Sequence, residues 1–421
     1  MKKPVIVIGA GAAGIIASYK AALDGATVLL LEKTDRIGTK ILISGGGKCN
    51  ITHDGPINSV LKAFRKNEAD FIRPSCFRYT NTDIINMLTE RGLNVYTRED
   101  GRIFPVDQTA KDVARILHTY LQDANVHIKF KAPVTEILAP GEKVEAVRID
   151  QETIPTNHVI LCTGGSSFPK SGTTGDGYTW AKSFGHTIVP ILAALAPVDL
   201  PLQNLQVKAG VPLRDIVLKA RVHNKVIAQW RGDMLFTHTG LTGPCVLGIT
   251  REISDYWHIE PAKLEVDLIP DLNFEQIQNR LIQFKNDRPG SQIRPFIEQK
   301  TTRGIVPLLL KTADVNEEEI NQHITKKQIN ILTQTLKAWQ LGPVKEVLLD
   351  RGEVVAGGVS LDEVDPHTMR SLKVQGLYLA GEVLDIAGPV GGYNLQAAWS
   401  TGFVAGETAA ADWESNTEDH Q

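Results

Sequence analysis

The sequence predicts a doubly wound α/β fold of Rossmann type, interrupted by an insertion with a β-barrel-like part and a helical part. A strand–glycine loop–helix–strand unit opens the chain, and two later strands, near residues 158 and 377, also end in glycine. With 421 residues, the chain is too long for one hydrophobic core. We expect a discontinuous α/β domain over 1–190 and 343–421, an inserted β domain over 191–270 and an inserted helical domain over 271–342.

The opening segment PVIVIGAGAAGIIASYKAALDGATVLLLEK, residues 4–33, has the pattern of a dinucleotide-binding loop. In such loops the first glycine allows a tight turn, the second admits a pyrophosphate and the third lets the helix pack on the strands. The start of the helix offers unpaired N–H groups and a partial positive charge to the phosphates. The predicted loop residues are Gly9, Gly11, Ala12, Ala13 and Gly14.

Glu32 lies at the end of the second predicted strand, 18 residues after Gly14. An acidic side chain near this position binds the ribose hydroxyl groups of a dinucleotide. The motif predicts dinucleotide binding but does not distinguish FAD from NAD(P).

The segment KTDRIGTKILISGGGKCNIT, residues 33–52, is polar and rich in glycine, which predicts an extended loop along a long ligand. FAD is long enough to need such a loop. The alternatives are a plain surface turn and a reactive-cysteine loop around Cys49. Because the next cysteine is Cys76, no resolving partner lies close by, and we interpret Cys49 as a small packed residue.

The segments Glu32-Lys33, Gly38-Thr39-Lys40 and Ser44–Asn50 resemble a bacterial family of NAD(P)/FAD-dependent oxidoreductases. That family includes aminoacetone oxidase and the bile-acid 3-dehydro-Δ4,6-reductase. The resemblance implies noncovalently bound FAD, with this segment beside the ribityl chain and the isoalloxazine ring. The residues implied are Lys33, Thr39, Lys40, Ser44, Gly45, Gly46, Gly47 and Asn50.

A second part of the flavin site is expected where the strand HVILC runs into Thr163, Gly164 and Gly165. In two-dinucleotide-type flavoproteins such a strand returns the chain to the cofactor domain. Val134, in the alternating segment before it, resembles the position whose backbone meets the adenine. A simple hairpin at a sheet edge also explains that alternation.

A third part is expected near the C-terminus, where a short strand ends in Gly381-Glu382, an arrangement that resembles a ribityl or phosphate contact. The segment from Gly391 then starts a helix of small residues, so that N–H groups face whatever lies before it. A positive helix end there would stabilise the reduced flavin. Gly392, Asn394 and Leu395 are the predicted contacts; the alternative is a C-terminal helix that simply starts with glycines.

Two residues are candidates for catalysis. His238 lies between strand residues and a Thr-Gly-Leu-Thr-Gly turn in the insertion, and Tyr393 lies directly before Asn394. His238 is interpreted either as a proton donor over the flavin or as an ordinary loop histidine. Tyr393 is interpreted either as a substrate contact or as packing against the ring. The insertion is expected to shape the substrate pocket.

The net charge of −3 and the absence of a basic block argue against a nucleic-acid partner. No apolar stretch approaches the ~18 residues of a membrane span, and the four cysteines form no disulfide framework, so we expect a cytoplasmic protein. We predict an FAD-dependent oxidoreductase acting on a small organic substrate. With no second strand–glycine loop–helix unit, NAD(P)H as a transient electron donor and oxygen as acceptor both stay open. The alternative is a flavin-binding protein in RNA modification or regulation, and nothing in the sequence indicates the substrate or the oligomeric state.

Overall fold

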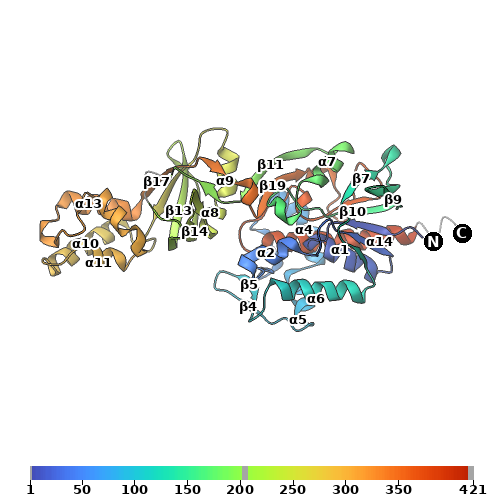
Figure 1. The fold of residues 1–421 in the computed structure, drawn as a ribbon, viewed down its shortest axis with the longest axis horizontal. Helices are drawn as coiled ribbons and strands as arrows, with labels where there is room; N and C mark the ends of the chain where they lie inside the picture. The colour runs from blue at the N-terminus through green and yellow to red at the C-terminus, as the bar shows by residue number, and fades with distance from the viewer. Residues whose placement is uncertain (1, 202–206, 416–421) are drawn as a thin grey trace. The chain divides into compact units, whose positions relative to one another are not determined.

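The computed structural model describes residues 2–201 and 207–415, and the chain divides into two compact units (Figure 1). The first unit contains Met1–Ile191 and Glu353–Gln421, and the second contains Leu192–Gly352. The two ends of the chain therefore build one unit, and the second is a continuous insertion. The strands and helices predicted as two inserted domains all belong to the second unit.

A five-stranded parallel sheet forms the centre of the first unit. Its order is β20 (Leu377–Leu379), β10 (His158–Leu161), β1 (Val5–Ile8), β2 (Val28–Leu31) and β6 (His127–Lys129). All residues of β1 and β10 are buried, as expected when helices or loops cover both faces of a parallel sheet. The carboxyl ends of β1, β2, β10 and β20 meet at one edge, because Ile8 pairs with both Leu31 and Leu161, and Leu161 pairs with Leu379. Ligands of open α/β sheets bind at this edge.

Helices α1 (Ala12–Leu23) and α14 (Tyr393–Ser415) run side by side in direct backbone contact (Figure 1). A Cβ atom on Gly402 or Gly406 would lie 2.3 Å from the carbonyl oxygen of Ala13 or Ala17. Small residues on both helices allow this approach. The last helix of the chain is thus held against the first.

The first unit contains further helices and small sheets. The helices are α2 (Thr39–Gly47), α3 (Ile57–Leu61), α4 (Lys66–Arg78), α5 (Asn81–Thr89), α6 (Ala110–Asp123) and α7 (Asp176–Ser183). Small sheets contain β3 (Thr52–His53), β5 (Arg102–Pro105) and β4 (Val95–Thr97), and β7 (Val134–Leu138), β8 (Ala146–Ile149) and β9 (Glu152–Pro155). A further pair joins β11 (Ile188–Leu195) and β19 (Val354–Val359).

The prediction of an extended loop over residues 33–52 is wrong in part, because α2 occupies Thr39–Gly47. The helical geometry stops at Ser44, and Gly45 and Gly46 have left-handed φ angles of 56° and 69°. Ile41 is buried and anchors this short helix to the core. The polar and glycine residues around Ile41 hide the helix in the sequence.

The second unit contains a seven-stranded antiparallel sheet in the order β17–β16–β13–β14–β15–β12–β18. The strands are β12 (Val198–Asp199), β13 (Pro212–Val222), β14 (Lys225–Phe236), β15 (Gly240–Thr242), β16 (Lys263–Asp267), β17 (Trp339–Pro343) and β18 (Glu346–Val347). Strands β17 and β18 occupy opposite ends of this order although only Val344 and Lys345 separate them in the chain. The sheet must therefore curl until its two edges approach each other, which gives the barrel-like form.

Helices of the second unit are α8 (Pro244–Leu247), α9 (Thr250–Tyr256), α10 (Phe274–Asp287), α11 (Arg294–Glu298), α12 (Val306–Thr312) and α13 (Lys326–Lys337). The apolar spacing of residues 295–310 and 317–339 predicts helices in both segments, and both predictions are wrong in extent. The first segment is broken between α11 and α12. The second starts only at Lys326, because Thr325 and Gln328 form a capping box there.

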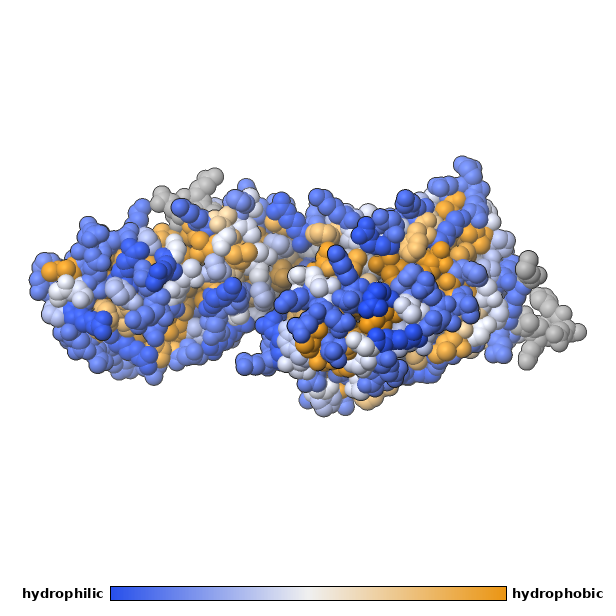
Figure 2. Space-filling model, turned by 60° about the horizontal axis from the view of Figure 1, so that its bottom comes forward, coloured by the Kyte–Doolittle hydropathy of each residue, from blue (hydrophilic) through white to orange (hydrophobic). Residues whose placement is uncertain are grey.

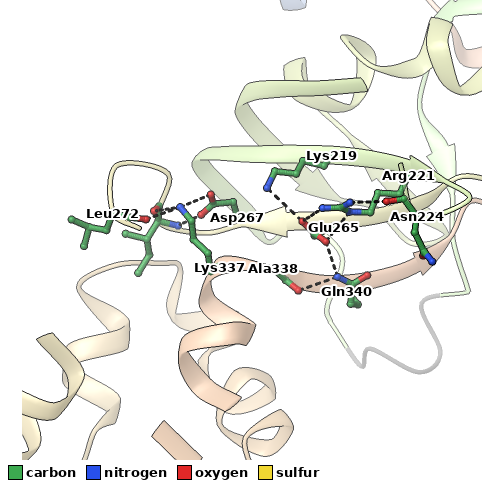
Figure 3. Close-up of polar contacts among 10 residues, drawn as sticks. Lys219, Arg221, Asn224, Glu265, Asp267, Leu272, Lys337, Ala338 and Gln340 are labelled. Atoms are coloured by element: carbon green, nitrogen blue, oxygen red, sulfur yellow. Dashed lines mark hydrogen bonds and ion pairs between the residues drawn. The ribbon is translucent and has the colours of Figure 1, made fainter. Parts of the chain in front are cut away.

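A buried carboxylate links three strands of this sheet (Figure 3). Glu265 on β16 accepts two hydrogen bonds from Arg221 on β13, at 3.0 and 3.2 Å, and one from Gln340 on β17, at 3.0 Å. Lys337, at the end of α13, bonds to Asp267 at 2.7 Å and to the carbonyl oxygen of Leu272 at 2.6 Å. These contacts join the helices of the unit to its sheet.

Hydrophilic residues cover most of the face drawn in Figure 2, with hydrophobic residues in separate patches. Within residues 2–201 and 207–415, no helix has both the length and the apolar character needed to cross a bilayer.

Candidate functional site

The glycine loop after β1 leaves open space at one of its three glycines. A Cβ atom on Gly9 would lie 2.5 Å from the carbonyl oxygen of Cys162, and one on Gly14 would lie 1.8 Å from that of Gly9. Both positions therefore require glycine. A Cβ atom on Gly11 would meet nothing within 4 Å, so the backbone at Gly11 is accessible to a ligand. Ala12 and Ala13 form the first turn of α1, beside this opening.

Glu32 follows β2 directly, and its carboxylate organises two backbone segments. One oxygen accepts a hydrogen bond from the N–H of Ala10 at 2.8 Å, and the other accepts from Thr34 at 2.7 Å. Each carboxylate oxygen keeps a second lone pair for a hydroxyl donor. The carbonyl of Glu32 accepts a hydrogen bond from the N–H of Ala132, two residues before Val134 at the start of β7.

Lys33 and Thr163 both lie near the start of α7. The ammonium of Lys33 contacts Asp176 at 2.7 Å and the hydroxyl of Thr174 at 2.6 Å. The hydroxyl of Thr163 is buried and has no hydrogen-bond partner among the described residues; a Cβ atom on Gly177 would lie 2.2 Å from it. A buried hydroxyl without a partner is destabilising and can accept a donor from a ligand.

The triple glycine has two different environments. A Cβ atom on Gly45 would lie 2.8 Å from the ring of Phe104, whereas one on Gly46 would meet nothing within 4 Å and one on Gly47 only the carbonyl of Leu42 at 3.9 Å. The hydroxyl of Ser44 donates to the carbonyl of Ile41. Gly46 and Gly47 thus leave the backbone accessible at the irregular end of α2, whereas Gly45 is packed.

An ion pair joins α2 to the end of β20. Lys40 lies 2.7 Å from the carboxylate of Glu382, which also accepts hydrogen bonds from the N–H groups of Gly165, at 3.3 Å, and Val355, at 3.0 Å. Thr39, one residue earlier, has its hydroxyl 3.5 Å from that of Thr34. Three predicted segments, around residues 40, 165 and 382, therefore meet at one carboxylate.

Glycine is also required at two positions next to the Lys40–Glu382 ion pair, Gly164 and Gly381. A Cβ atom on Gly164 would lie 3.0 Å from Thr173, and one on Gly381 would lie 2.9 Å from Ala13. Gly381 thus brings the end of β20 against the first turn of α1.

The start of α14 is held by Asn50. With its amide oriented to satisfy both neighbours, Asn50 accepts from the N–H of Gly392 at 2.8 Å and donates to the carbonyl of Thr52 at 3.1 Å. Gly392 has a φ of 89°, and a Cβ atom there would lie 2.6 Å from the backbone of Thr52. Only glycine fits this crossing of β3 and α14.

Asn394 has a structural partner. Its side chain accepts from the N–H of Gly388 and donates to the carbonyl of the same residue, both at 2.8 Å. Leu395 is half-buried and packs against the core of the first unit. The first intrahelical bond of this region runs from Gln396 to Gly392, at 3.0 Å. The three N–H groups before Gln396 therefore have no intrahelical partner.

Tyr393 lies between two aromatic side chains. Its ring stacks on His53 with 4.5 Å between centroids, and Phe64 meets it edge-on at 6.1 Å. Burial, together with the nearby Asp100, raises the pKa of Tyr393 above that of a free phenol. The phenol thus keeps its proton at neutral pH.

His53, the second residue of β3, was not predicted from the sequence, where a single histidine gives no signal. Its Nδ1 lies 3.1 Å from the carbonyl oxygen of Gly391 and donates to it, since a carbonyl only accepts. His238 lies in the second unit, exposed on the turn between β14 and β15. Its role stays a prediction.

These residues fit a long dinucleotide. Open backbone at Gly11 suits a pyrophosphate, and free lone pairs on Glu32 suit ribose hydroxyls. Open backbone at Gly46 and the N–H groups at the start of α14 suit a flavin. Burial raises the pKa of Cys49 to about 12, so its thiol is protonated at neutral pH.

The family model described as HI0933-like protein Rossmann domain matches residues 3–408. The chain belongs to this family. The ribosomal RNA dihydrouridine synthase of Escherichia coli is 31% identical over 410 residues, which cover 96% of this chain and 98% of that protein. The 3-dehydro-bile acid delta(4,6)-reductase of Clostridium scindens is 31% identical over 407 residues, with 96% and 98% covered. The predicted resemblance to the family of the bile-acid reductase is confirmed.

This chain, a member of the HI0933-like family, shares its fold with two enzymes of solved structure. The 3-ketosteroid delta1-dehydrogenase of Sterolibacterium denitrificans has a TM-score of 0.55 at 14% identity, covering 97% of this chain and 99% of that one. The E. coli quinol fumarate reductase subunit FrdA has a TM-score of 0.52 at 16% identity, covering 99% and 71%. The predicted fold class is confirmed.

Proposed function

We propose that this protein is a reductase that adds a hydride and a proton across a carbon–carbon double bond conjugated with a carbonyl group. Two relatives of equal identity support this reaction. A dihydrouridine synthase saturates the double bond of the uracil ring, and a 3-dehydro-bile acid delta(4,6)-reductase acts on double bonds conjugated with a 3-keto group. The substrates differ, but the reacting group is the same in both.

The proposed reaction needs two reactants besides the alkene. When bound and reduced, FAD supplies the hydride for the carbon β to the carbonyl and is itself oxidised. The α carbon then takes a proton, and the double bond becomes single. NAD(P)H is the proposed source of the two electrons, docking transiently because no second glycine-loop unit is present in the sequence.

Tyr393 is the proposed proton donor, and its position at the start of α14, stacked on His53, is the observation on which the assignment depends. Its phenol is half-buried, its pKa is raised, and it lies at the start of α14, whose unpaired N–H groups favour negative charge nearby. A phenol that stays neutral at pH 7 can donate its proton to a developing enolate.

An anaerobic experiment tests this function. The purified protein is reduced with NADPH or dithionite, a conjugated enone such as 2-cyclohexen-1-one is added, and the return of oxidised flavin absorption is followed. We expect reoxidation with one saturated ketone formed per flavin. Tyr393→Phe should slow this step by about 10²–10⁴-fold and leave the FAD content unchanged. Reoxidation by oxygen alone, with no enone or uracil compound reduced, would identify an oxidase and contradict the proposal.

A uracil base in RNA is a second candidate substrate, favoured by the near-complete coverage of two ribosomal RNA dihydrouridine synthases at 31% identity. Replacing the enone by a uridine-containing oligoribonucleotide, with dihydrouridine as the product measured, distinguishes the two substrates.

A further inference from the structure

Residues 62–78 form a basic surface segment that the flavin site does not use. The segment contains five Lys or Arg and two Asp or Glu, a difference of +3, whereas the whole chain carries −3. An average over 421 residues conceals this local excess of positive charge.

One face of α4 combines basic and aromatic side chains. Lys66, Asp70, Arg73 and Phe77 follow one another at spacings of four, three and four residues, so they lie on one side of the helix. All four are exposed, Phe77 at 52%. Asp70 contacts Lys66 at 2.7 Å and Arg73 at 3.7 Å. One carboxylate thus faces two cations, and the face stays positive.

A hollow of about 570 Å³ lies at the start of this face. Lys62, Lys66 and Arg73 line it together with Asn58, whose side-chain oxygen lies 3.4 Å from Arg73. Lys62 is exposed, and no hydrogen bond or ion pair to another described residue is found for its ammonium. Three cationic groups therefore converge on a concave surface with one carboxylate, Asp70.

The hollow shares a wall with the surroundings of the proposed proton donor. Phe64 lines the hollow and also meets the ring of Tyr393 edge-on at 6.1 Å. The helix behind the hollow is fixed to α14, because the hydroxyl of Ser400 donates to the carbonyl of Tyr79 at 2.7 Å. A ligand in the hollow would thus lie next to the reacting end of the site.

We propose that this surface, defined by Lys62, Lys66, Arg73 and Phe77, binds a single-stranded segment of an RNA substrate. The cationic groups contact its phosphates in the hollow, and a base stacks on Phe77. Basic grooves beside exposed aromatic side chains bind single strands in this way. The inference rests on the second candidate substrate above, a uracil base in RNA.

The chemistry of the surface favours RNA over an anionic membrane. A helix that lies on a membrane presents a broad apolar face, whereas the exposed face of α4 carries Phe77 alone among charged groups. A concave cationic hollow suits a phosphate group, which accepts several charge-assisted hydrogen bonds at once.

Fluorescence anisotropy with a labelled single-stranded oligouridylate tests the surface, using the FAD-loaded protein with oxidised flavin. Lys62→Gln/Arg73→Gln should weaken binding and lower the slope of log K against log salt by about 1.4, since each phosphate contact on a single strand contributes about 0.7. Phe77→Ala should weaken binding by about 5- to 150-fold. The matched control is Lys111→Gln/Lys182→Gln, which removes the same charge from exposed positions on α6 and α7 and should bind as the wild type does.

FAD content and thermal unfolding check that each variant is folded. An unchanged salt slope in Lys62→Gln/Arg73→Gln, an equal loss in the control, or no binding by the wild type would overturn the proposal. Equal or tighter binding to phosphatidylserine vesicles would overturn it as well. RNA binding is measured here without turnover, whereas the proposed reduction is measured with the small enone. A failure of RNA binding can therefore be distinguished from a failure of the proposed reduction.

Discussion

The rings of His53 and Tyr393 stack with 4.5 Å between centroids and 21° between planes, although 340 residues separate them in the chain. The bond from His53 Nδ1 to the carbonyl of Gly391 fixes the imidazole, and the imidazole in turn fixes the phenol. Both contacts hold Tyr393 in one orientation at the start of α14.

His53→Ala should therefore lower the rate of enone reduction by about 2- to 13-fold, the value of one aromatic pair. His53→Phe keeps the stacked ring and should restore most of the rate. KM for NADPH and the FAD content should stay constant in both variants. Stopped-flow reoxidation measures the step, and equal rates in all three proteins would remove His53 from the site.

Glu32→Ala should weaken FAD binding by about 1–3 kcal/mol, because the charge-assisted bonds to the ribose are lost. Glu32→Gln keeps the length and one acceptor oxygen, and should have an intermediate effect. Isothermal titration of the apoprotein with FAD measures both. Thermal unfolding of the apoprotein serves as a control, since Glu32 also binds Ala10 and Thr34. Unchanged affinity would exclude Glu32 from the ribose contact.

Cys49→Ser should retain FAD and its rate of reduction, because the thiol is buried and its pKa of about 12 leaves it protonated at neutral pH. The absorption spectrum of the reduced and partly reduced protein is the measurement. A long-wavelength thiolate–flavin band that disappears in the variant would contradict this prediction.

Gly392→Val should reduce FAD occupancy or make the flavin harder to reduce. The new Cβ atom would lie 2.6 Å from the backbone of Thr52, and φ at this position is 89°. Gly290→Ala is the matched control, since a Cβ atom there meets nothing within 4 Å and φ is not positive. Flavin-to-protein ratio and reduction potential are compared. Normal occupancy and potential in Gly392→Val would separate this helix start from the flavin.

Glu265→Gln should destabilise the second unit at neutral pH and change its response to acid. Burial opposes ionisation of Glu265, but the hydrogen bonds from Arg221 and Gln340 outweigh it and hold the pKa below its usual value. The lowered pKa stabilises the folded state above the pKa of the unfolded chain, and this contribution is lost as pH falls through the folded pKa. The unfolding temperature should fall less between pH 7 and pH 3 in the variant than in the wild type. An equal fall in both proteins would contradict this prediction.

The glycine loop and Glu32 could be predicted because their roles depend on neighbours close in the chain. Turn, helix start and strand end follow each other within residues 5–32, and the spacing of small and apolar residues defines all three. The family could be predicted for the same reason, since its motifs are contiguous. The roles of the individual site residues stay predictions until FAD binding is measured.

Helix limits were less predictable, because breaks depend on local capping and packing. Thr325 and Gln328 start α13 nine residues later than its apolar spacing indicates, counting from residue 317. Thr39–Ile43 form helix within a segment whose polar and glycine-rich composition indicates a loop.

The sequence by itself determined the fold class and the family, because these depend on contiguous patterns of hydrophobic and glycine residues. Tertiary structure decided which distant residues meet: Lys40 with Glu382, Asn50 with Gly392, and His53 with Tyr393. Such pairs form only when the parallel sheet brings the ends of its strands to one edge and α14 folds back against α1. The basic face of α4 likewise depends on the folded backbone. Lys66, Arg73 and Phe77 lie on the same side only because the segment is helical, and their positions in the sequence do not by themselves say which way the side chains point.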